Sequence, residues 1–138
     1  MTETHAWNAL LDLGHEAMDH EHHLQIALVS AFIEAVEQAR PILARQLADQ
    51  LERYSVVHFG SEELLMDATG YAGRARHAGE HAEFLSQIRG LAGDLDAGAT
   101  DPAIASAIDL RAALAAHMNE ADRRLAGHVT PRTVVRGS

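Results

Sequence analysis

The sequence predicts an all-α protein, folded as an up-down-up-down four-helix bundle with an irregular N-terminal arm. Apolar residues recur at intervals of three and four in four separate segments, which is the spacing of amphipathic helices. Short stretches with glycine or proline separate these segments, and short connections favour antiparallel neighbours. The length of 138 residues suits one hydrophobic core. We expect an arm over residues 1–16, a bundle over 17–127 and a short C-terminal tail over 128–138.

The first two helices are predicted over about 17–39 and 41–66. In the first, Ile26, Val29, Ile33 and Val36 form an apolar stripe. Pro41 ends that pattern and is expected in the first turn of the second helix, where the missing N–H has no helical partner. The loop 69–73 then leads to a third helix.

The third and fourth helices are predicted over about 74–91 and from 101 to about 126. The stretch 93–100 contains two glycines and two aspartates and is expected to be a loop. Asp101 is predicted to cap the fourth helix, with Pro102 at its first position. Gly127 is predicted to end it.

Composition and charge narrow the functional classes. Hydrophobic residues make up 47% of the chain but aromatic residues only 4%, so alanine and leucine must fill most of the core. No apolar run approaches the roughly 18 residues of a membrane span, and the first residues lack a signal-peptide pattern, so we expect a cytoplasmic protein. The net charge of −9 argues against nucleic-acid binding.

Seven polar residues interrupt the apolar stripes at helical spacing. In the first helix, the periodicity selects His22 over His20 and His23, because His22 lies four residues before Ile26. Side chains at i and i+4 share one face of a helix. Asp122, five residues after His117, is offset from it by about 140° on an ideal helix. The candidate ligands are His22, His58, Glu62, His77, His81, His117 and Asp122.

This set is best explained by metal binding. A single histidine on an apolar face is usually a hydrogen-bonded core residue, but burial of so many ionisable groups is costly without a bound cation. The set exceeds the four ligands of a tetrahedral zinc ion. Two ions that share both carboxylates and a solvent-derived oxygen account for it. Five histidines then divide unequally, which leaves one ion saturated and the other with a vacant position.

The same residues resemble the hemerythrin family, in particular its single-domain bacterial members, over about residues 7–125. The resemblance rests on Trp7, Leu13-Gly14, Met18-Asp19-His20-Glu21-His22, Tyr54-x-x-x-His58-Phe59-x-x-Glu62, Gly70-Tyr71, His77-x-x-x-His81 and His117-x-x-x-x-Asp122. It implies two irons in a four-helix bundle, bridged by an oxo or hydroxo group, that bind dioxygen reversibly.

The resemblance also implies a role for each residue. His77, His81 and His117 would hold the saturated iron, and His22 and His58 the open iron. Glu62 and Asp122 would bridge both irons. Leu114 fits the aliphatic wall of the ligand pocket, with Phe59 and Met66 as further wall residues. Ala113 stands where the family usually has a large aromatic residue, so we expect a more open pocket and faster oxidation.

The sequence therefore favours a non-enzymatic protein for storage, transport or buffering of dioxygen. Nitric oxide, azide and other small anions are further expected ligands, and a protein partner is compatible with the acidic composition. One alternative is a di-iron enzyme such as a peroxidase, an oxidase or a nitric-oxide-handling protein; another is an oxygen or redox sensor. The Glu-x-x-His pairs of ferritin-like oxidases are absent from the sequence. Glu63 is expected to be solvated, and Gln25 departs from the apolar residue common in the family.

Overall fold

The computed structural model describes residues 16–129. Its helices are α2 (Glu16–Glu37), α3 (Pro41–Thr69), α4 (Arg74–Asp96) and α5 (Thr100–His117). A π-helical turn, η1 (Met118–Asp122), follows α5, and residues 123–129 are again helical. The predicted all-α bundle is confirmed. The expectations for the N-terminal arm up to residue 15, including Trp7 and Leu13-Gly14, and for residues 130–138 lie outside the described residues.

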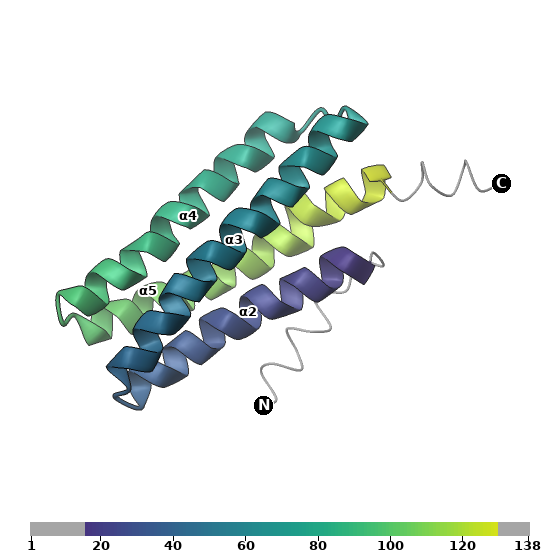
Figure 1. Cartoon of the computed structure of the whole chain (residues 1–138). Coiled ribbons are helices and arrows are strands. Elements are labelled where there is room, and N and C mark those ends of the chain that lie inside the picture. Colours follow the sequence, from purple (N-terminus) through teal and green to yellow (C-terminus); the bar gives the residue numbers. More distant parts are fainter. Residues whose placement is uncertain (1–15, 130–138) are drawn as a thin grey trace.

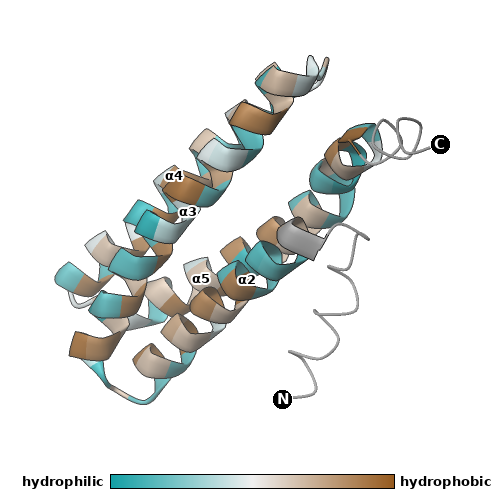
Figure 2. Ribbon diagram, turned by 45° about the vertical axis from the view of Figure 1, so that its right-hand side comes forward, coloured by the Kyte–Doolittle hydropathy of each residue, from teal (hydrophilic) through white to brown (hydrophobic). Residues whose placement is uncertain are grey.

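Each helix packs mainly against two neighbours, and the helices run side by side along the bundle (Figure 1). α2 contacts α3 and α5, and α4 also contacts α3 and α5. Every helix carries both hydrophobic and hydrophilic residues along its length (Figure 2). The core of large side chains includes Phe32, Leu51, Ile88, Leu110 and Leu114, and alanines such as Ala44, Ala48, Ala103 and Ala107 fill the spaces between the helices.

The second helix begins where the sequence predicts, whereas α2 ends at Glu37, two residues before the expected end at Ala39. Ala39 has a φ of 55° in the tight turn after α2, and Pro41 lies in the first turn of α3 as expected. α3 runs three residues beyond its predicted end and stops at Gly70, whose φ is 63°. A left-handed residue at this position is cheap only for glycine, which explains the termination.

The ends of the last two helices were predicted wrongly. α4 continues to Asp96, because Leu91 is buried in the core and Leu95 packs against it. Arg45 on α3 also holds this end by hydrogen bonds to Asp96 and to the Ala92 carbonyl.

The fourth helix also begins and ends differently from the prediction. α5 starts at Thr100 without a side-chain cap, so Asp101 lies in the first turn and is not the N-cap. Gly127 lies within the helical stretch 123–129 and does not end it. None of the described helices is both long and apolar enough to cross a membrane.

The π-helical turn η1 sets the orientation of everything that follows His117. An ideal α-helix places the residue five positions on about 140° away. The wider turn adds one residue to the helix, so Asp122 returns to the face that carries His117. Asp122 Oδ1 consequently lies 3.1 Å from His117 Nε2. This local change brings the last predicted ligand to the interior of the bundle.

Candidate metal centre

The structure brings all seven predicted ligands together inside the bundle. α2 supplies His22, α3 supplies His58 and Glu62, α4 supplies His77 and His81, and α5 with η1 supplies His117 and Asp122. Each is at most 5% exposed. In contrast His20 is exposed and His23 is half-buried, as the apolar periodicity of α2 predicts.

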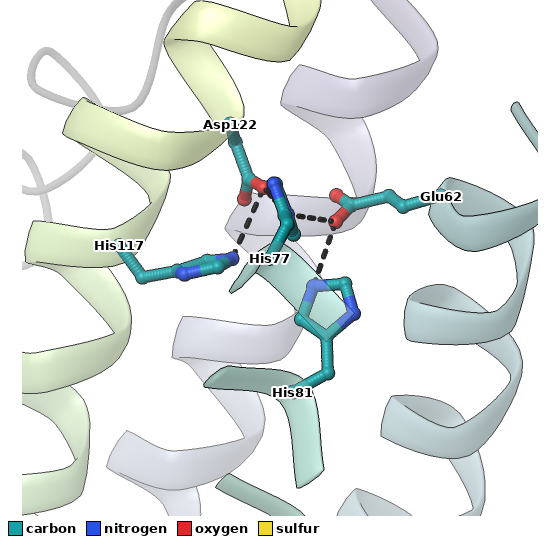
Figure 3. Close-up of side chains that lie close together, drawn as sticks. All are labelled: Glu62, His77, His81, His117 and Asp122. Atoms are coloured by element: carbon teal, nitrogen blue, oxygen red, sulfur yellow. Dashed lines mark hydrogen bonds and ion pairs between the residues drawn. The ribbon is translucent and has the colours of Figure 1, made fainter. Parts of the chain in front are cut away.

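The ligand atoms form two groups that share both carboxylates. One group contains His77, His81 and His117 with Glu62 and Asp122, and Figure 3 shows these five side chains directed toward one another. The other contains His22 and His58 with the same Glu62 and Asp122. Within each group the potential ligand atoms all lie within 4.8 Å of one another. The arrangement can therefore hold two cations, with three histidines on one side and two on the other.

The two oxygens of Glu62 face different groups. Oε1 lies 3.2 Å from His77 Nε2 and 3.0 Å from His81 Nε2. Oε2 lies 3.1 Å from His58 Nε2 and 3.4 Å from His22 Nε2. One carboxylate thus offers one oxygen to each side of the centre, which is how a bridging carboxylate binds two ions.

Asp122 divides its oxygens in the same way. Oδ1 lies 2.8 Å from His77 Nε2 and 3.1 Å from His117 Nε2, whereas Oδ2 lies 2.9 Å from His22 Nε2. The three-histidine side is therefore defined by Oε1 and Oδ1, and the two-histidine side by Oε2 and Oδ2. Both carboxylates make the same division independently.

The spacing of these atoms is that expected of metal ligands. Adjacent ligands of a six-coordinate ion with bonds of about 2.1 Å lie about 3 Å apart, and the contacts above measure 2.8–3.4 Å. Hydrogen bonds span similar distances, but His58 Nε2, His81 Nε2, His117 Nε2 and Asp122 Oδ1 are buried and make no hydrogen bond with the described residues. Buried polar atoms are almost always paired. Nitrogen and carboxylate ligands suit iron, manganese, cobalt or zinc.

The electrostatics of the metal-free centre show how strongly the groups interact. Burial by itself lowers the pKa of His22, but contacts with Asp122 and Glu62 outweigh it and raise that pKa to about 9. The pKa of His77 is raised to about 9 by the same balance of burial and carboxylate contacts. Burial alone would raise the pKa values of Glu62 and Asp122, but the surrounding imidazoles hold both well below their usual range. Both carboxylates are therefore ionised and available to bind cations.

Three further carboxylates hold the outer nitrogens of the histidines. In each case the acceptor lies on the preceding helix, and the donor is an imidazole Nδ1–H. The pairs are Glu21 with His58 at 2.5 Å, Glu63 with His81 at 3.0 Å and Glu80 with His117 at 2.7 Å. A proton held on Nδ1 leaves the Nε2 lone pair free to bind a metal, so these contacts select the required tautomer.

The expectation that Glu63 is solvated is wrong, because its carboxylate is committed to His81. The roles of Glu21 and Glu80 were not foreseen. The sequence signal was adjacency: Glu21 precedes His22, Glu63 follows Glu62, and Glu80 precedes His81. A residue next to an inward-facing ligand lies about 100° around the helix, where its side chain reaches the neighbouring helix.

The predicted pocket residues occupy different surroundings. Leu114 and Met66 are fully buried. Phe59 stacks on His81 with ring centroids 4.1 Å apart, so it covers a histidine of the three-histidine side. Ala113 is half-buried and borders a groove of about 400 Å³ between α4 and α5. None of the seven candidate ligands borders that groove.

Comparison with known proteins places this centre in a family. Residues 13–129 match the family described as Hemerythrin HHE cation binding domain. This chain belongs to the hemerythrin family. The chain is also similar to a myohemerythrin from Riftia pachyptila, with 30% identity over 92 residues, which cover 67% of this chain and 72% of the relative. No solved structure matches the chain.

Membership of the hemerythrin family agrees with the resemblance inferred from the sequence. The family is described as a cation-binding domain, and the buried cluster of histidine, glutamate and aspartate side chains could hold a metal ion. The role of each hemerythrin-like ligand, and of the pocket residues, stays a prediction.

Proposed function

We propose that this chain binds dioxygen reversibly at a non-haem di-iron centre, for storage, transport or buffering. The observation that carries the proposal is the unequal division of the ligands around two shared carboxylates. Three histidines lie beside Oε1 of Glu62 or Oδ1 of Asp122. The other two histidines lie beside Oε2 of Glu62 or Oδ2 of Asp122. The two sides thus differ by one protein ligand, which leaves room for a small exogenous ligand on one side only.

In this proposal His77, His81 and His117 hold the saturated iron, and His22 and His58 hold the open iron. Glu62 and Asp122 bridge both irons. When bound, the iron pair supplies reversible electron transfer to dioxygen. The protein residues orient the imidazoles and keep a proton on Nδ1, since the Nδ1–H groups of His58, His81 and His117 are held by carboxylates, which leaves Nε2 directed at the iron.

The surroundings of the centre favour binding over turnover. Phe59 stacks on His81, and Phe84 makes an edge contact with His117 at 5.2 Å between ring centroids. Both rings are buried, and Phe59 also lies 5.6 Å from His58 between ring centroids, so an apolar ring reaches the two-histidine side as well. Apolar walls exclude water and limit proton delivery, which protects a bound ligand from further reaction.

The decisive experiment is a reversal of oxygenation. The protein is loaded with iron, reduced without air, exposed to air and then placed under vacuum while its absorption is recorded. We expect an absorption band that appears in air and disappears under vacuum over several cycles. Irreversible oxidation, with consumption of an added reductant, would instead identify an oxidase or peroxidase and overturn the proposal.

A further inference from the structure

Gln25 is a buried amide that has only part of its hydrogen-bonding capacity satisfied. It lies on α2 with no exposed surface. Its Nε2 donates to Ser55 Oγ on α3 at 2.8 Å, whereas its Oε1 makes no hydrogen bond with the described residues. An unpaired buried amide oxygen is destabilising, and apolar residues fill most of the surrounding core. A purely structural role therefore does not explain the choice of glutamine.

The pair lies one helical turn from the two-histidine side of the centre. Gln25 follows His22 by three residues, and Ser55 precedes His58 by three residues. Residues three apart are neighbours on one helix face. Side chains of helices also lean toward the N-terminus, so the amide of Gln25 leans toward the turn that carries His22. Both members of the pair thus lie next to a ligand of the side that has one histidine fewer.

The chemistry of the pair suits a small ligand that can exchange hydrogen bonds. A serine hydroxyl both donates and accepts, and an amide offers an oxygen acceptor and two N–H donors. With Ser55 as the fixed partner, rotation of the Gln25 amide presents either oxygen or N–H to a ligand. The pair can accordingly accept from a protonated ligand or donate to an anion.

We propose that Gln25, held by Ser55, forms a polar wall of the exogenous-ligand site and selects for small hydrogen-bonding ligands over apolar ones. The inference rests on the proposed function, because the open position belongs to the iron held by His22 and His58. It adds the ligand class: azide-like anions and protonated oxygen species bind more tightly than an apolar pocket would allow.

The test compares Gln25→Leu, Ser55→Ala and a control, Ile26→Leu, which alters the shape of an adjacent buried residue without loss of a polar group. Azide is titrated into the oxidised, iron-loaded proteins and followed by absorption. We expect azide affinity to fall about tenfold or more in Gln25→Leu, because hydrogen bonds to charged ligands are among the stronger ones. The fall is smaller in Ser55→Ala, and Ile26→Leu stays within about twofold of the parent chain.

Two readouts do not depend on iron. The melting temperature of metal-free Gln25→Leu is expected to equal or exceed that of the parent, because an unpaired buried acceptor is removed. A high-resolution crystal structure of the metal-free protein is expected to show an ordered water on the Gln25 amide toward His22 and His58.

A lower melting temperature of Gln25→Leu would overturn the proposal, since it would assign the amide a structural role. Unchanged azide affinity, or an amide fully paired within the protein, would also overturn it. These results differ from failure of the proposed function, which appears as a parent chain that does not bind two irons or does not oxygenate reversibly.

Discussion

Glu80→Gln tests whether the outer carboxylates tune the centre. Glu80 accepts a hydrogen bond from His117 Nδ1 at 2.7 Å, a short distance that is typical of a charge-assisted bond. Glutamine keeps the size and an acceptor oxygen but removes the charge. Loss of such a partner commonly lowers metal affinity by about 10–100-fold, which corresponds to about 1.4–2.7 kcal/mol. The carboxylate is 33% exposed, so we expect the lower part of this range.

The assay is competition for iron with a coloured chelator, on Glu80→Gln and a matched control, Glu83→Gln. Glu83 lies on the same helix, is exposed and makes no hydrogen bond or ion pair with a candidate ligand among the described residues. Both variants change the net charge equally, so a general electrostatic effect would lower both affinities by the same factor. Equal losses, or no loss in Glu80→Gln, would refute the reasoning that the contact with His117 supports the metal.

Three other perturbations test other parts of the account. Asp122→Asn removes the charge of one shared carboxylate, and we expect the iron content to fall by half or more on elemental analysis; full loading would contradict a bridging role. In the metal-free protein, the pKa values of His22 and His77 are raised from 6.5 to about 9, so the folded state binds more protons. The stability that this proton binding contributes is complete below about pH 6.5 and is lost as pH rises through about 9. Melting temperatures measured with a chelator present should therefore fall over this interval. A melting temperature that does not change with pH would contradict the contacts of these histidines with the carboxylates. Ala113→Trp adds a large aromatic ring one turn before His117 and should slow loss of the oxygenated spectrum in air; an unchanged rate would contradict the expected role of this position in the ligand pocket.

Much of the fold and the candidate site follows from periodicity. The apolar stripe of α2 places His22 inside and His20 outside, and the structure agrees. Pro41 is found where its missing N–H predicts it. These features depend on local geometry, which a single sequence specifies well.

The remaining features depend on contacts between helices. The position of Asp122 requires a π-helical turn, which the ideal period of 3.6 residues does not contain. Glu21 and Glu80 act on histidines of the next helix, so no pattern within one helix reveals them. The extension of α4 past Gly93 depends on Leu95, which packs against the core, and on Arg45 from α3. Tertiary packing overrides the weak local signal for a loop there.

The most direct test of the central claim is anomalous X-ray diffraction at the iron edge from crystals of the iron-loaded protein. We expect two peaks in each chain, about 3.5–4 Å apart, with Glu62 and Asp122 between them. The peak on the His77, His81 and His117 side should show no free coordination position, and the other peak should show one. A single peak, or two peaks that do not share both carboxylates, would contradict the account.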